Sequence, residues 1–113
     1  MRNKYKWMIV GGAGYIGSHV SRCFLDNSLD VVIVDNLVTG IKERIPEKVK
    51  LIKLNCENHR KLKKHILENK VDGIVHLAAF KQARESLRDP IKYWDNNIRS
   101  TLGIVKALSL IHI

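Results

Sequence analysis

Short apolar runs and amphipathic stretches alternate along this chain of 113 residues. Four apolar runs have the length and composition of buried strands, and they lie at 7–10, 31–35, 49–54 and 73–79. Apolar residues recur at helical spacing between and after them, which predicts helices at 15–27, 57–69 and 90–110. We expect the stretches at 39–47 and 80–88 to be loops.

A glycine-rich turn joins the first predicted strand to the first predicted helix. It reads V-G-G-A-G-Y-I-G over residues 10–17. Gly11 allows a sharp turn, Gly14 lets a pyrophosphate approach the backbone, and Gly17 lets the helix pack close to the sheet. The first turn of the helix then offers free N–H groups to phosphate oxygens. The glycines alone would also suit an ordinary turn, but between two strands they predict a dinucleotide-binding unit.

An acidic residue closes the second predicted strand. Asp35 lies 18 residues beyond Gly17, at the position where a carboxylate accepts hydrogen bonds from the adenine ribose diol. A carboxylate there also repels the 2′-phosphate of NADP. We therefore predict NAD as the preferred ligand.

Strands that alternate with helices favour an α/β fold with a parallel sheet. Right-handed crossovers then allow the strand order 3-2-1-4, numbered along the chain, with a ligand crevice between strands one and four. We interpret the whole chain, 1–113, as a single domain with a partial Rossmann fold, because it is too short for two domains.

The apolar positions also predict which side of each helix faces the core. The last helix has a favourable start, with Asp89 as its cap and Pro90 in its first turn. The predicted inward positions are Ile16, Val20, Cys23 and Phe24 in the first helix, and Ile91, Trp94, Ile98, Leu102 and Val105 in the last.

The formal net charge of +9 raises nucleic acid as a partner. Much of the excess lies between His59 and Lys70, where apolar residues at helical spacing indicate the solvated side of an amphipathic helix. No aromatic residues are interleaved with these charges, so we do not expect nucleic acid to bind. No apolar run approaches the roughly 20 residues of a membrane span. Cys23 and Cys56 have no metal-ligand or redox spacing, and we expect a cytoplasmic protein without a metal site.

Four segments together resemble the UDP-glucose 4-epimerase family, within the extended short-chain dehydrogenase/reductase superfamily. They are G-G-A-G-Y-I-G-S-H at 11–19, V-D-N-L at 34–37, V-H-L-A-A-F-K at 75–81 and E-S-L-R-D-P-I-K-Y-W-D-N-N at 85–97. The resemblance covers nearly the whole chain. It implies NAD as cofactor and, in a complete enzyme, interconversion of UDP-galactose and UDP-glucose through a 4-keto sugar. Other NAD-dependent nucleotide-sugar epimerases and dehydratases share most of these motifs.

The resemblance implies roles for the matching positions. The glycine turn would hold the pyrophosphate, the ends of the second and third strands the adenosine, and the end of the fourth strand with the last helix the nicotinamide side. In that order the residues are Gly11, Gly14, Tyr15, Ile16 and Gly17; Asp35, Asn36, Asn55 and Cys56; and Ala78, Ala79, Phe80, Lys81 and Asn96. Lys81 would equally suit an exposed strand end, and Asn96 a local turn. Asn55 and Cys56 depart from the family, which usually has Asp followed by Ile or Val.

The catalytic pair of the superfamily, Tyr-x-x-x-Lys, does not occur in these residues. The three tyrosines are followed four positions later by Ile9, His19 and Asn97. We therefore interpret the chain as the cofactor-binding first part of an epimerase, inactive alone, with the catalytic half and the sugar-binding domain absent. A non-catalytic NAD-binding or interaction module is the alternative.

We also expect the chain to form a homo-oligomer. The apolar fourth strand would leave an open edge, and the last helix would leave Trp94 and Ile98 partly bare.

Overall fold

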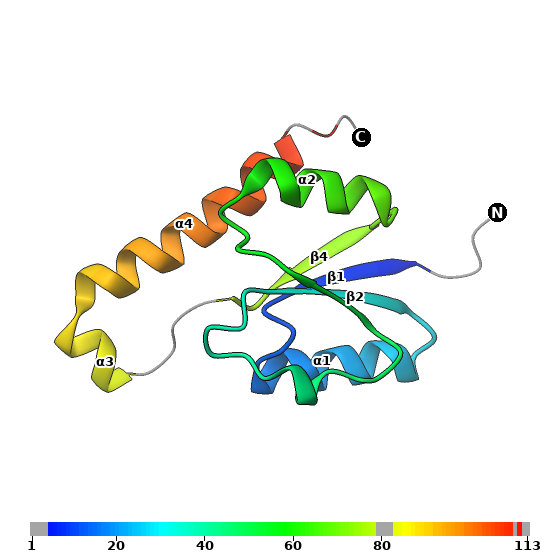
Figure 1. Cartoon of the computed structure of the whole chain (residues 1–113), viewed down its shortest axis with the longest axis horizontal. Helices are drawn as coiled ribbons and strands as arrows, with labels where there is room; N and C mark the ends of the chain where they lie inside the picture. The colour runs from blue at the N-terminus through cyan, green and yellow to red at the C-terminus, as the bar shows by residue number, and fades with distance from the viewer. Residues whose placement is uncertain (1–4, 79–82, 110, 112–113) are drawn as a thin grey trace.

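The computed structural model describes residues 5–78, 83–109 and 111. In chain order the elements are β1 (Lys6–Val10), α1 (Tyr15–Asp26), β2 (Asp30–Asp35), the short 3-10 helix η1 (Lys42–Arg44), β3 (Lys50–Lys53), α2 (His59–Glu68), β4 (Gly73–His76), α3 (Ala83–Arg88) and α4 (Pro90–Ser109). The strands described form one parallel sheet in the order β3-β2-β1-β4 (Figure 1), which confirms the predicted fold class and strand order.

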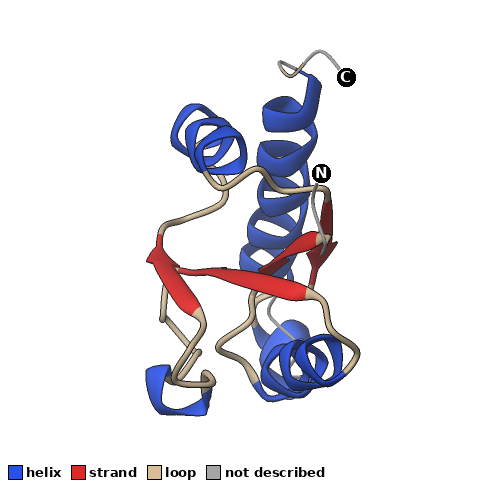
Figure 2. Ribbon diagram, turned by 90° about the vertical axis from the view of Figure 1, so that its right-hand side faces the viewer, coloured by secondary structure: helices blue, strands red, loops and turns tan. Residues whose placement is uncertain are grey.

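Helices cover both faces of this sheet. Helix α1 lies on one face, and α2 and α4 lie on the other (Figures 1 and 2). Successive residues of a strand point to opposite faces, so each strand contributes to two cores. Met8, Val10, Val32, Val34 and Ile52 pack with α2 and α4, whereas Ile9, Val31 and Ile33 pack with α1. This explains why β1 and β2 are apolar throughout rather than alternating.

Helix α1 packs closely because its buried residues are small. They are Gly17, Ser18 and Ser21. A Cβ at Gly17 would lie 2.4 Å from the Gly11 carbonyl oxygen. The prediction of Ile16 and Cys23 as inward residues was wrong, since both are exposed. The larger Val20 and Phe24 are partly buried beside this close contact, as expected.

The inward face of α4 was also predicted wrongly. Its buried residues are Tyr93, Ser100, Gly103, Ile104 and Ala107. The predicted residues are exposed, from 43% at Ile98 and 48% at Leu102 to 54% at Val105, 72% at Trp94 and 79% at Ile91. A Cβ at Gly103 would lie 2.1 Å from the Cys56 carbonyl oxygen. The helix therefore packs on the backbone that leaves β3, and a contact this close requires small residues.

The remaining differences from prediction concern element ends and two short helices, of which η1 lies within the predicted loop at 39–47. Strand β4 ends at His76 rather than at residue 79, and α3 occupies part of the predicted loop at 80–88. In α2, Leu62 and Ile66 are buried while Arg60, Lys61 and Lys64 are exposed, which agrees with a solvated basic face. Among the described residues, no helix is long and apolar enough to cross a membrane.

Gly103→Ala tests the close packing of α4. Alanine favours a helix over glycine by about 1 kcal/mol, so propensity alone predicts a gain in stability. We expect a loss of about 1–3 kcal/mol instead, because the new methyl group overlaps the backbone of Cys56. Urea unfolding measures the difference. Lys106→Ala, at an exposed position one turn further along, should change stability little; an unchanged or raised stability of Gly103→Ala would show that the helix does not sit this close.

Candidate nucleotide-binding site

The turn after β1 depends on glycine for its geometry. Gly11 has a φ of 88°, in the left-handed region that favours glycine, and its N–H donates to the Val34 carbonyl oxygen over 2.8 Å. A Cβ at Gly11 would lie 2.6 Å from the Ala78 nitrogen. The turn is thus held between β2 on one side of β1 and the segment that follows β4 on the other side.

The amino end of α1 is only lightly packed at Gly14. Gly14 precedes the helix and makes no side-chain cap. A Cβ there would meet only the Gly11 carbonyl oxygen, at 3.4 Å. An uncapped helix start with free N–H groups is suited to a pyrophosphate. Tyr15 and Ile16 follow at the surface, where the Tyr15 ring contacts His19 edge-on.

The carboxylate of Asp35 connects this turn to the end of β2. One oxygen, Oδ2, accepts from the Ala13 N–H over 3.0 Å, and the other, Oδ1, accepts from the Leu37 N–H over 2.7 Å. Leu37 has a φ of 62°, an unusual conformation for a leucine. A Cβ at Gly40 would lie 2.8 Å from Oδ1, so the loop after β2 passes directly over the carboxylate. Asp35 is only 9% exposed and keeps a fixed orientation.

Two asparagines follow the ends of β2 and β3, and each forms a local turn. Asn36 Oδ1 accepts from the Val38 N–H, and Asn55 Oδ1 accepts from the Glu57 N–H, both over 3.0 Å. Both asparagines are exposed. Their side chains therefore stand at the carboxyl edge of the sheet with their amide oxygens already bonded.

Cys56 differs from its neighbour in burial. Its thiol lies in the core and donates to the Ser100 carbonyl oxygen over 3.7 Å. Burial raises the pKa of this thiol, which stays protonated at neutral pH. The side chain is thus part of the packing between β3 and α4, and the contact of Cys56 with a cofactor stays a prediction.

The predicted nicotinamide side is described only in part. Ala78 is half-buried and its nitrogen lies beside the glycine turn. The predictions for Ala79, Phe80 and Lys81 fall outside the described residues. Asn96, in α4, donates from Nδ2 to Asn97 Oδ1 over 3.1 Å. The predicted place of Asn96 on the nicotinamide side stays a prediction.

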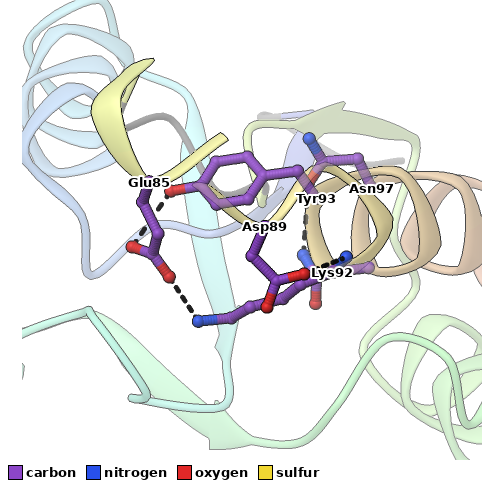
Figure 3. A network of polar contacts seen from close by, with 6 residues as sticks. Glu85, Asp89, Lys92, Tyr93 and Asn97 are labelled. Atoms are coloured by element: carbon purple, nitrogen blue, oxygen red, sulfur yellow. Dashed lines mark hydrogen bonds and ion pairs between the residues drawn. The ribbon is translucent and has the colours of Figure 1, made fainter. Parts of the chain in front are cut away.

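A polar network joins α3 to α4, and sequence reasoning missed it (Figure 3). The Tyr93 hydroxyl donates to Glu85 Oε2 over 3.1 Å, and the Lys92 ammonium pairs with Glu85 Oε1. Asp89 caps α4 by accepting from the Lys92 N–H over 3.1 Å, as predicted. The Lys92 partner lowers the pKa of the Glu85 carboxyl. This network fixes the direction in which α4 starts.

A parallel sheet in this order, a glycine turn leading into an uncapped helix, and an acid at the end of the next strand define a Rossmann-type dinucleotide-binding domain. The model of the NAD dependent epimerase/dehydratase family matches residues 7–113. The chain belongs to this family. The predicted NAD cofactor is thus confirmed as the cofactor that the family description names.

Known proteins place the chain within the family more closely. The UDP-glucose 4-epimerase of Lacticaseibacillus casei is 38% identical over 101 residues, which cover 89% of this chain and 30% of that protein. A crystal structure of UDP-glucose 4-epimerase matches with a TM-score of 0.87 and 32% identity, over 92% of this chain and 32% of that one. The Brucella ovis enzyme in complex with NAD matches with a TM-score of 0.86 and 28% identity, over 91% of this chain and 31% of that one. The chain spans about a third of the length of these relatives, in their N-terminal part.

Glu85→Gln tests the network between α3 and α4. Because the folded-state pKa of Glu85 is lowered, its stabilising effect is present above the ordinary carboxyl pKa of 4.5 and is lost as the pH falls through the folded-state value. Wild type should therefore melt higher than Glu85→Gln near neutral pH, and the gap should close in acid. Thermal unfolding followed by circular dichroism at a series of pH values measures this difference in melting temperature. Glu68→Gln, which removes an exposed ion pair with Lys64, serves as control; an equal gap for Glu85→Gln at every pH would rule out the ion pair as its cause.

Proposed function

We propose that this chain is the NAD-binding portion of an enzyme like UDP-glucose 4-epimerase. The observation that carries the proposal is the position of Asp35: a buried carboxylate hydrogen-bonded to the glycine turn at Ala13, beside the uncapped start of α1. The proposed ribose acceptor thus lies beside the backbone N–H groups that we propose as hydrogen-bond donors to the pyrophosphate. The UDP-glucose 4-epimerases that the chain resembles, one of them in complex with NAD, support it.

The proposal gives each described element a task in holding the cofactor. Backbone N–H groups at the start of α1 bind the pyrophosphate. Asp35 accepts from the ribose diol with the lone pairs that Ala13 and Leu37 leave unused, since two carboxylate oxygens offer about four acceptor sites. The negative charge of Asp35 disfavours a 2′-phosphate, and the next residue, Asn36, brings no positive charge to offset it.

In the proposed complete enzyme, NAD would supply a reversible hydride acceptor for C4 of the UDP-sugar, and an acid/base group outside these residues would exchange the hydroxyl proton. The residues of this chain hold and orient the cofactor for that hydride transfer. No tyrosine among the 113 residues is followed four positions later by lysine, so no acid/base pair of the superfamily type is present. We therefore propose that the chain alone does not interconvert UDP-galactose and UDP-glucose. The complete enzyme is then one of galactose and nucleotide-sugar metabolism.

The same absence favours a second candidate function, a non-catalytic NAD-binding or interaction module. Two free cysteines, Cys23 and Cys56, suit the reducing cytoplasm that we propose for either candidate. The two candidates share the cofactor site and differ in whether a catalytic half accompanies it.

Calorimetric titration with NAD and NADP tests the proposed site. We expect NAD to bind with a dissociation constant between micromolar and millimolar, about −8 to −4 kcal/mol, and more tightly than NADP. Asp35→Ala should weaken NAD binding and reduce the discrimination. Asp30→Ala removes the same charge from the opposite end of β2. It should leave the affinity for NAD and the preference for NAD over NADP unchanged.

Equal or tighter binding of NADP by the wild-type chain would contradict this assignment of Asp35. Circular dichroism of Asp35→Ala checks that the fold survives the loss of its two backbone hydrogen bonds.

An activity assay tests the proposed inactivity. The wild-type chain, given UDP-galactose and NAD, should form no UDP-glucose above a buffer control, and product formation would overturn the proposed inactivity.

We also propose that the chain associates with itself through α4. Its exposed residues Ile91, Trp94, Ile98, Leu102 and Val105 recur at helical spacing and form one apolar strip. Strand β4 lies at an edge of the sheet as described. An apolar strip of this length beside a sheet edge favours association, because a second copy would remove both from water.

Light scattering tests whether the apolar strip of α4 mediates this association. The wild-type chain should have a mass above its monomer mass of 13.0 kDa at micromolar concentrations. Trp94→Glu should shift the mass to that of the monomer, since a charge within an apolar contact is costly to bury. Leu67→Glu introduces the same charge at an exposed apolar residue of α2 and should leave the mass unchanged. A monomeric wild type with a cooperative melt would overturn the proposed association.

A further inference from the structure

The order of the strands predicts where the base of a bound dinucleotide lies. The glycine turn after β1 takes the pyrophosphate, and Asp35 at the end of β2 takes the ribose. Because the phosphate leaves this ribose on the β1 side, the base leaves it on the other side, towards β3. Strand β3 is the neighbour of β2 there, with Asp35 opposite Lys53 and the Leu54 N–H bonded to the Asp35 carbonyl oxygen over 3.1 Å. The residue that follows is Asn55.

The orientation of the Asn55 amide is determined by its local turn. The Glu57 N–H is a donor, so the side-chain atom that it meets at 3.0 Å must be the oxygen, Oδ1. The nitrogen, Nδ2, then points away from that bond. Among the described residues Nδ2 has no hydrogen-bond partner, and Asn55 is exposed. Two N–H donors are thus held at the place where the base is expected, beside one remaining acceptor site on Oδ1.

We propose that Asn55 relaxes the specificity of this site for its purine base, so that a 6-oxopurine dinucleotide binds as well as the adenine form. The proposal rests on the proposed NAD site. Adenine carries an amino donor at position 6, and hypoxanthine carries a carbonyl acceptor there. A carboxylate can only accept, so Asp at this position would favour adenine. The Asn amide donates and accepts, and it can therefore pair with either base.

Asn55→Asp is the matched substitution, because it removes the donors while keeping the shape of the side chain. A carboxylate oxygen can still accept from the Glu57 N–H, which preserves the turn. Asn58→Asp is the control. It makes the same change three residues further on, where the Asn58 oxygen accepts from the Lys61 N–H over 3.3 Å and caps α2. Asp caps a helix as well as Asn does, and both variants add one negative charge near the same loop.

The experiment is calorimetric titration of the wild-type chain and both variants with NAD and with nicotinamide hypoxanthine dinucleotide. For the wild type we expect two dissociation constants within about threefold of each other. For Asn55→Asp the ratio should move towards adenine by about fivefold, within the roughly two- to tenfold range of one exchanged hydrogen bond. For Asn58→Asp the ratio should equal that of the wild type.

Three results would overturn the proposal while NAD binding itself holds. They are a wild-type preference for adenine of about tenfold or more, an unchanged ratio in Asn55→Asp, and an equal shift in Asn58→Asp, which would trace the effect to charge alone. If neither dinucleotide binds to the wild-type chain, both this proposal and the proposed NAD site are wrong.

Discussion

The hydrogen bond from the Ala13 N–H to Asp35 Oδ2 is the contact on which the geometry of the site depends. It ties the turn after β1 to the end of β2, while the second carboxylate oxygen holds Leu37 in a left-handed conformation. A buried carboxylate requires such partners, since a charge taken out of water is costly without them. The Asp35 carboxylate and the glycine turn, for which we propose contacts with the ribose and the pyrophosphate, are therefore parts of one hydrogen-bonded unit.

Burial on both faces of the sheet explains which parts of the fold could be predicted. Strands β1 and β2 contribute alternately to two cores, so they are apolar throughout and easily recognised. Glycine spacing and crossover handedness then determine the strand order. The positions of Gly11 and Asp35 relative to each other follow from the same rules, so the sequence could indicate that both lie at the carboxyl edge of the sheet.

Helix faces were predicted less well because close packing selects for size rather than hydrophobicity. In α4 the buried side carries Ser100, Gly103 and Ala107, while the larger apolar residues at helical spacing lie outside. Periodicity alone cannot distinguish two apolar sides of one helix. Helix α3 has only six residues and is held by contacts of Glu85 with Lys92 and Tyr93 across a break in the helix, so local sequence gives no sign of it.

The close contact of Gly103 with the Cys56 carbonyl group limits how α4 can move. Backbone meets backbone there, so no side chain can change its rotamer to absorb a movement of the helix. The outer side of helix α4 carries Trp94, and its inner side rests on the backbone that follows Asn55. A side chain larger than glycine at position 103 could therefore be accommodated only if the helix and that backbone moved apart.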